Sequence, residues 1–158
     1  MRRRPVSAIV VALLAALATA CVTVPEAEPS PREAPATSDT CPPDARAGAV
    51  ATIAGQLDAF ARDDYAAALG FASDTFQAAT DVPTFRSLIE RDFPQVASPE
   101  AHTVLACEQP VVGVVRVLVV VTGVDGSSQE LVYLVVDNGE RWGIDGAAPR
   151  RRSGGVTA

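Results

Sequence analysis

The chain has 158 residues, and its formal net charge of −6 at pH 7 reflects 19 acidic residues against 13 basic ones. This length leaves room for one domain once an export leader and a linker are set aside. Hydrophobic residues make up 48% of the chain but aromatic residues only 5%, so valine, alanine and leucine must build the core. The acidic balance argues against a nucleic acid partner, because phosphate binding requires clustered positive charge.

The first 20 residues have the three parts of a bacterial export signal: a charged start, an apolar core and a zone of small residues. The charges are the arginines at positions 2–4, and the apolar core runs over 6–17. This core is shorter than the ~20 residues that a helix needs to span a bilayer, which favours a leader over a permanent transmembrane helix. We therefore expect residues 1–20 to be a signal peptide.

Cys21 directly follows the small residues Ala18, Thr19 and Ala20. This arrangement resembles the lipobox of bacterial lipoproteins, in which the cysteine thiol is diacylated before the leader is cleaved. The resemblance implies that Cys21 is the lipidation site and that the lipid holds the protein on the extracytoplasmic face of the cell membrane. Plain secretion and an uncleaved membrane anchor are the two alternatives.

Residues 21–43 combine this cysteine with a stretch rich in proline, alanine, serine, threonine and glutamate that has no apolar periodicity. Such a composition buries too little surface to offset its ordering entropy, so we expect a disordered linker that lifts the domain off the membrane. We expect the domain itself to occupy residues 44–148. We expect the tail from Ala147 to Ala158 to be disordered, with residues 149–158 lying beyond the domain.

Helical periodicity begins directly after this linker. Asp44 is the expected N-cap of a first helix that runs to about residue 62. The apolar residues of this segment recur at spacings of 3, 4 and 3, which places them on one buried stripe. The stripe consists of Val50, Ile53, Leu57 and Phe60.

Shorter helices follow the first one. Asp64 can cap a second helix over 65–70, and a further turn of helix is expected over 74–79. Asp81 can cap a last helix over 83–91, because proline is tolerated in the first turn of a helix. The apolar face of this last helix is formed by Phe85, Leu88 and Ile89.

The apolar period changes to two after residue 99, which indicates strands. The expected strands cover about 102–108, 111–122, 129–137 and 140–146. In the second, the valines at 115, 117, 119 and 121 share one face, while Arg116 and Thr122 lie on the other, partly wet face. Asn138-Gly139 is a strong hairpin signal. The sequence therefore predicts an α+β fold, with three to four N-terminal helices packed on one face of a curved, four-stranded antiparallel sheet.

Cys41 and Cys107 remain as a pair if Cys21 is lipidated. An exported location is oxidising, so we expect these two cysteines to form a disulfide. Free thiols and a metal site are the alternatives. A metal is disfavoured because no CxxC pattern occurs and the one histidine, His102, cannot complete a zinc tetrahedron with two cysteines. We expect no metal and no cofactor.

The stretch from Gln56 to Ser73 resembles an uncharacterised bacterial domain family with the pattern Q-x-x-A-F-x-x-D-D-x-x-x-A-x-x-F-A-S. The ending Trp142-Gly143-Ile144-Asp145-Gly146 looks like the closing strand of nuclear-transport-factor-2-like and cystatin-like domains. Together the resemblance covers about residues 46–147. It implies a cone-shaped α+β fold with a cavity between helices and sheet. It implies no particular activity, because fold alone does not give function.

The residues that could carry chemistry in such a cavity are few. They are Asp63, Asp64, Tyr65, His102 and Tyr133, with Asp145 as a further candidate. Isomerases and cyclases of similar fold place an Asp or His opposite a Tyr across an apolar cavity. Capping and solvation are the alternative roles of the two adjacent aspartates.

These observations leave several functions open. The favoured hypothesis is a non-enzymatic lipoprotein, attached to the membrane by its lipid, whose domain binds a small molecule, peptide or partner protein. An isomerase- or cyclase-like enzyme with a conical pocket is the alternative, and a structural accessory of the envelope is a third. No catalytic residue is assigned, because the sequence contains no nucleophile elbow, phosphate loop or HExxH motif.

Overall fold

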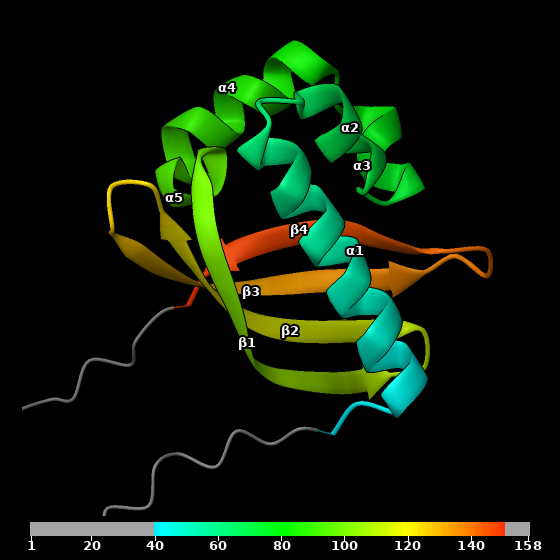
Figure 1. The fold of residues 1–158 in the computed structure, drawn as a ribbon. Coiled ribbons are helices and arrows are strands. Elements are labelled where there is room, and N and C mark those ends of the chain that lie inside the picture. Colours follow the sequence, from blue (N-terminus) through cyan, green and yellow to red (C-terminus); the bar gives the residue numbers. More distant parts are fainter. Residues whose placement is uncertain (1–39, 151–158) are drawn as a thin grey trace, which may run out of the picture. The chain divides into compact units, whose positions relative to one another are not determined.

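The computed structural model describes residues 40–150, and these residues fold as five helices followed by a four-stranded antiparallel sheet (Figure 1). The α+β class and the order of helices before strands are confirmed. The expected leader, Cys21 and most of the linker lie outside the described residues, as do the last eight residues of the tail. Within residues 40–150, no helix is long and apolar enough to cross a membrane.

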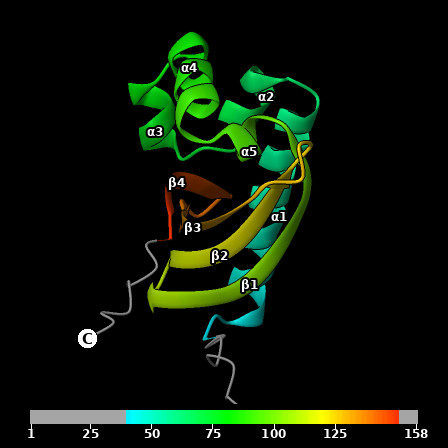
Figure 2. The same ribbon diagram turned by 90° about the vertical axis from the view of Figure 1, so that its left-hand side faces the viewer.

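The helices all precede the sheet in the chain. They are α1 (Pro43–Ala61), α2 (Tyr65–Gly70), α3 (Asp74–Ala79), α4 (Val82–Asp92) and α5 (Pro94–Ala97). The strands pair in the order β1-β2-β3-β4, and each pairing is antiparallel. They are β1 (Pro99–Val111), β2 (Val114–Gly123), β3 (Ser128–Asp137) and β4 (Trp142–Pro149). Figure 2 shows the sheet curving around α1, with the other helices gathered at one end of the sheet.

The helix starts follow the predicted caps with one exception. The Asp64 and Asp81 carboxylates accept hydrogen bonds from the backbone N–H of the third residue of α2 and of α4, as N-caps do. The expectation for Asp44 is wrong, because α1 begins two residues earlier than a cap at Asp44 predicts, and Pro42 is its N-cap. A proline at the first helical position is pre-organised for the helix, so Asp44 lies within the first turn. Its charge is still favourable there, at the positive end of the helix dipole.

Two further boundaries differ from the sequence-based expectation. The turn α5 was not predicted, and it buries Val96 beneath the helices. The last strand begins at Trp142 and extends to Pro149, so order does not fade after residue 146. Backbone pairing of Pro149 with Leu131 in β3 holds this end in the sheet, although Gly146-Ala147-Ala148 has little strand propensity of its own.

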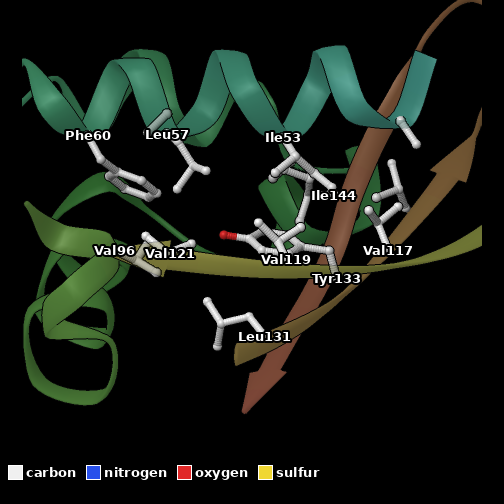
Figure 3. Packing of buried hydrophobic residues seen from close by; sticks show 14 of the residues in the cluster. Ile53, Leu57, Phe60, Val96, Val117, Val119, Val121, Leu131, Tyr133 and Ile144 are labelled. Carbon is white, nitrogen blue, oxygen red and sulfur yellow. The ribbon is translucent and has the colours of Figure 1, made fainter. Parts of the chain in front are cut away.

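The core lies between α1 and the concave face of the sheet (Figure 3). All four predicted inward valines of β2 are fully buried, and Leu131, Tyr133 and Val135 of β3 continue the same face. From α1, the buried residues include Ile53, Leu57 and Phe60, as predicted, while Val50 packs at the edge of the core. Gly48 allows this close packing, because a Cβ there would collide with the ring of Trp142.

Cys41 and Cys107 lie at disulfide distance, with 5.5 Å between their Cα atoms, which confirms the predicted pairing. The bridge joins the segment before α1 to the middle of β1. The backbone N–H of Thr40 also donates a hydrogen bond of 2.9 Å to the carbonyl of Cys107. The start of the domain is therefore fastened to an edge strand of the sheet.

Candidate ligand cavity

A cavity of about 130 Å³ lies between the short helices and the inner face of β3 and β4. Its walls come from every helix of the domain except α2, together with the loop residue Ala72 and the third and fourth strands. The apolar side chains of the lining belong to Ala72, Phe76, Phe85, Leu88, Ile89, Phe93, Val96, Leu131, Ile144 and Ala147. Gln56, Tyr133 and Gly146 complete it. None of these lining residues carries a charge.

Tyr133 places a phenol group at this apolar cavity. The side chain projects from the concave face of β3 and is only 1% exposed to solvent. Figure 3 shows its hydroxyl oxygen directed inwards, into the layer between α1 and the sheet. Burial raises the pKa of Tyr133, so the hydroxyl keeps its proton at neutral pH. Within residues 40–150 this hydroxyl makes no hydrogen bond.

Gln56 supplies the second polar side chain of the cavity wall. It lies on the buried side of α1 and is 5% exposed. Its Nε2 donates a hydrogen bond of 3.2 Å to the carbonyl of Ala68, which ties α1 to α2 and fixes the amide. This is the one hydrogen bond that the Gln56 side chain makes in the described part of the chain, so its Oε1 remains available as an acceptor.

The two adjacent aspartates have local structural roles away from the cavity. Asp64 accepts a hydrogen bond of 2.9 Å from the backbone N–H of Ala67 and so caps α2. Asp63 has a φ of 57°, in the left-handed region that Asp tolerates better than most residues. Its carboxylate lies 3.0 Å from the Arg86 guanidinium on the exposed surface. The alternative of capping and solvation therefore describes this pair.

Tyr65 belongs to the joint between α2 and α4. Its ring packs edge-on against Phe60, with centroids 5.5 Å apart, and the Arg86 guanidinium lies over the ring, 4.6 Å from its centre. Burial raises the pKa of Tyr65, and the nearby Glu90 carboxylate adds to the rise. The ring and hydroxyl of Tyr65 are thus already engaged by neighbouring side chains and do not line the cavity.

His102 and Asp145 are also separate from the cavity. His102 is exposed on β1, in the register position opposite Val121. Asp145 accepts a hydrogen bond of 2.6 Å from the hydroxyl of Ser73, and that same hydroxyl accepts one from the backbone N–H of Phe76 to cap α3. Of the predicted site residues, only Tyr133 lines the cavity. The Asp–Tyr or His–Tyr pairing that the enzyme alternative requires is not found among the described residues.

Gln56 is the site residue that the sequence analysis missed as chemistry. It follows Ile53 by three residues, so it falls on the buried side of the same helix, where a polar side chain is uncommon. The signal that could have identified Gln56 is a polar residue at a position where the helical periodicity predicts an apolar one. Among residues 40–150, no group of three or more His, Cys, Asp or Glu residues could hold a metal ion.

Comparison with known proteins gives one match. A sequence model of the family described as "Domain of unknown function (DUF4864)" matches residues 44–154, which include all of the helices and strands from Asp44 onwards. No curated protein and no solved structure gives a match.

Proposed function

The chain belongs to the DUF4864 family, and we propose that it is a membrane-anchored extracytoplasmic lipoprotein whose domain binds a small, mainly apolar molecule in the cavity between α4 and the sheet. The domain then acts as a binding module and not as an enzyme. Its fold would be of the nuclear-transport-factor-2-like or cystatin-like type, with α1 lying across a curved sheet and the shorter helices closing one end. The ligand would enter between these helices and β4.

The observation that carries the binding proposal is Tyr133, which lines the apolar cavity and whose hydroxyl makes no hydrogen bond within residues 40–150. A buried polar group without a partner costs about 1–3 kcal/mol, so folded proteins nearly always pair it. Phenylalanine at this position would fill the same space without that cost. A bound molecule that forms a hydrogen bond with the hydroxyl would explain why a tyrosine occupies this position.

Support for the anchor comes from the sequence around Cys21 and from the other two cysteines. Cys41 and Cys107 lie at disulfide distance, which suits an oxidising compartment outside the cytoplasm. With these two cysteines joined to each other, Cys21 is the one cysteine left for acylation. The linker after it would let the domain stand clear of the headgroups.

A cavity-filling variant tests the binding proposal. Ala147 lines the cavity and lies opposite Tyr133 in the sheet register, so Ala147→Leu adds volume where the ligand would bind. The matched control is Ala66→Leu on the exposed side of α2. We expect toluene, used as a small apolar probe, to raise the Tm of the wild type and of Ala66→Leu but not that of Ala147→Leu. Equal Tm increases in all three proteins would place the binding elsewhere.

Metabolic labelling tests the anchor. A clickable fatty acid should label the wild-type protein in growing bacterial cells and leave Cys21→Ser unlabelled. Equal labelling of the two proteins would refute lipidation at this cysteine. Cell fractionation of the same cultures should move the Cys21→Ser protein out of the membrane fraction.

A further inference from the structure

The charge of the cavity wall restricts what can bind in it. Among residues 40–150, no Arg, His, Asp or Glu lines the cavity, and the polar side chains of the lining are those of Gln56 and Tyr133. Moving an ion from water into such an apolar site costs several kcal/mol when no counter-charge compensates it. Carboxylates, phosphates and ammonium compounds are therefore poor ligands for this site.

The two polar side chains of the wall are complementary to one hydroxyl group. The Tyr133 hydroxyl can donate a hydrogen bond, and the Gln56 Oε1 can accept one because its own Nε2 is already held by Ala68. Both residues line the cavity, Tyr133 from the sheet and Gln56 from α1. A hydroxyl group is both a donor and an acceptor, so it can bind to both residues at once.

The volume and shape of the cavity set the size of the ligand. At about 130 Å³ it is close to the engineered cavities of ~150 Å³ that bind benzene between leucine, isoleucine and phenylalanine side chains. Phe76, Phe85 and Phe93 contribute aromatic rings to the wall. The rings of Phe76 and Phe85 pack edge-to-face, with their centroids 5.8 Å apart. Offset or edge-on stacking against such rings favours a planar ring as ligand.

From these three constraints we infer that the natural ligand is an uncharged, planar, single-ring compound with one hydroxyl group, of the phenol class, and that Tyr133 and Gln56 together recognise the hydroxyl. This inference rests on the proposed binding function and adds the chemical class of the ligand. Tyr133 is then the residue that separates hydroxylated rings from plain hydrocarbons of the same size.

Three probes of matched shape test this inference: 4-methylphenol, toluene and 4-methylbenzoate. They share one methylated ring and differ in carrying a hydroxyl, no polar group or a charged carboxylate. Binding is measured by isothermal titration calorimetry on the full-length protein in lipid nanodiscs, with protein-free nanodiscs as the blank. We expect the wild type to bind 4-methylphenol roughly tenfold more tightly than toluene, as one or two net hydrogen bonds would give. The carboxylate should not bind measurably.

Two tyrosine variants complete the test. Tyr133→Phe removes only the hydroxyl oxygen and leaves the acceptor of Gln56 in place, so it should lower the affinity for 4-methylphenol severalfold, towards that of toluene, and leave toluene binding unchanged. Tyr65→Phe is the matched control, because Tyr65 is also buried but does not line the cavity. It should keep the wild-type preference. Gln56→Leu, which keeps the bulk of the side chain, should reduce the preference as Tyr133→Phe does.

The outcomes distinguish a failure of this inference from a failure of the proposed binding function on which it rests. If toluene binds as tightly as 4-methylphenol and Tyr133→Phe changes neither affinity, the ligand class is wrong while the apolar site stands. Binding of 4-methylbenzoate in preference to both neutral probes would also overturn the ligand class. If none of the three probes binds to folded wild-type protein, the binding function fails, and the inference fails with it.

Discussion

Breaking the bond between Cys41 and Cys107 is expected to destabilise the domain more than any single substitution on its surface. Cys107 is fully buried in β1, and Cys41 precedes α1, so the bond ties the first helix to an edge strand. The two cysteines are 66 residues apart in the chain. For a closed loop of that length, the chain-entropy model gives a stabilisation of about 4 kcal/mol. Small domains have a free energy of unfolding of roughly 5–15 kcal/mol, so the loss would be large.

Urea unfolding measures this loss directly. Trp142 is the only tryptophan of the chain and packs against the core next to Gly48, so its fluorescence reports on the contact between α1 and β4. With a urea m-value of roughly 1–3 kcal/mol/M, a loss of about 4 kcal/mol should lower the unfolding midpoint by roughly 2 M. We expect this shift both for reduced wild-type protein and for the variant with Cys41→Ala and Cys107→Ala.

The Cys21→Ser protein is the control for this measurement. It keeps the bridge, so its midpoint should equal that of the oxidised wild type and should fall by the same amount on reduction. An oxidised and a reduced wild type that unfold at the same urea concentration would refute the reasoning. That result would mean that the bridge is not formed in the protein or does not restrict the unfolded chain.

Three further predictions follow from single contacts. Gly143→Ala should lower the free energy of unfolding, measured with urea, by roughly 1–3 kcal/mol, because the new Cβ would lie 2.8 Å from the Cα of Ser73. In the same strand, the Cβ of Gly146→Ala would meet nothing within 4 Å, so this control should be close to neutral. Ser73→Ala removes both the cap of α3 and the hydrogen bond to the Asp145 carboxylate, so we expect its free energy of unfolding to fall by about 1–2 kcal/mol. The control Ser87→Ala, on the exposed side of α4, should lose less than ~0.5 kcal/mol. The free energy of unfolding should fall as the pH rises above ~10, because burial raises the pKa of Tyr133 and the unfolded chain therefore loses that proton first. In a pH series of urea titrations, the free energy of unfolding of Tyr133→Phe should fall less steeply than that of the wild type. Identical slopes for the two proteins would contradict this prediction.

Local sequence patterns were sufficient to predict most of the helices and strands of this domain. Spacings of three and four put Ile53, Leu57 and Phe60 on one face of α1, and alternation put the inward valines on one face of β2. The short turn α5 was missed because Phe93-Pro94 has the composition of a helix end and α5 is only four residues long. The end of β4 was missed because pairing with β3, more than ten residues away in the chain, holds it in the sheet.

The cavity was harder to predict than the fold. Asp63 and Asp64 have the residue types of an acid–base pair, but one binds Arg86 on the surface and the other caps a helix. Tyr133 was a correct candidate by type. That it lines one cavity with Gln56 depends on how α1 lies on the sheet, which brings together residues 77 positions apart. No local pattern encodes that arrangement, because it results from packing between distant elements.

The most direct test of the proposed function is to locate a bound ring in the folded protein. Full-length protein with labelled Ile, Leu and Val methyl groups, in lipid nanodiscs, would be saturated with 4-methylphenol and studied by NMR. The proposal predicts nuclear Overhauser effects from the ring protons to the methyl groups of Leu88, Ile89 and Leu131, which line the cavity. Contacts confined to the exposed Val112 and Val124, with none to the three cavity residues, would contradict it.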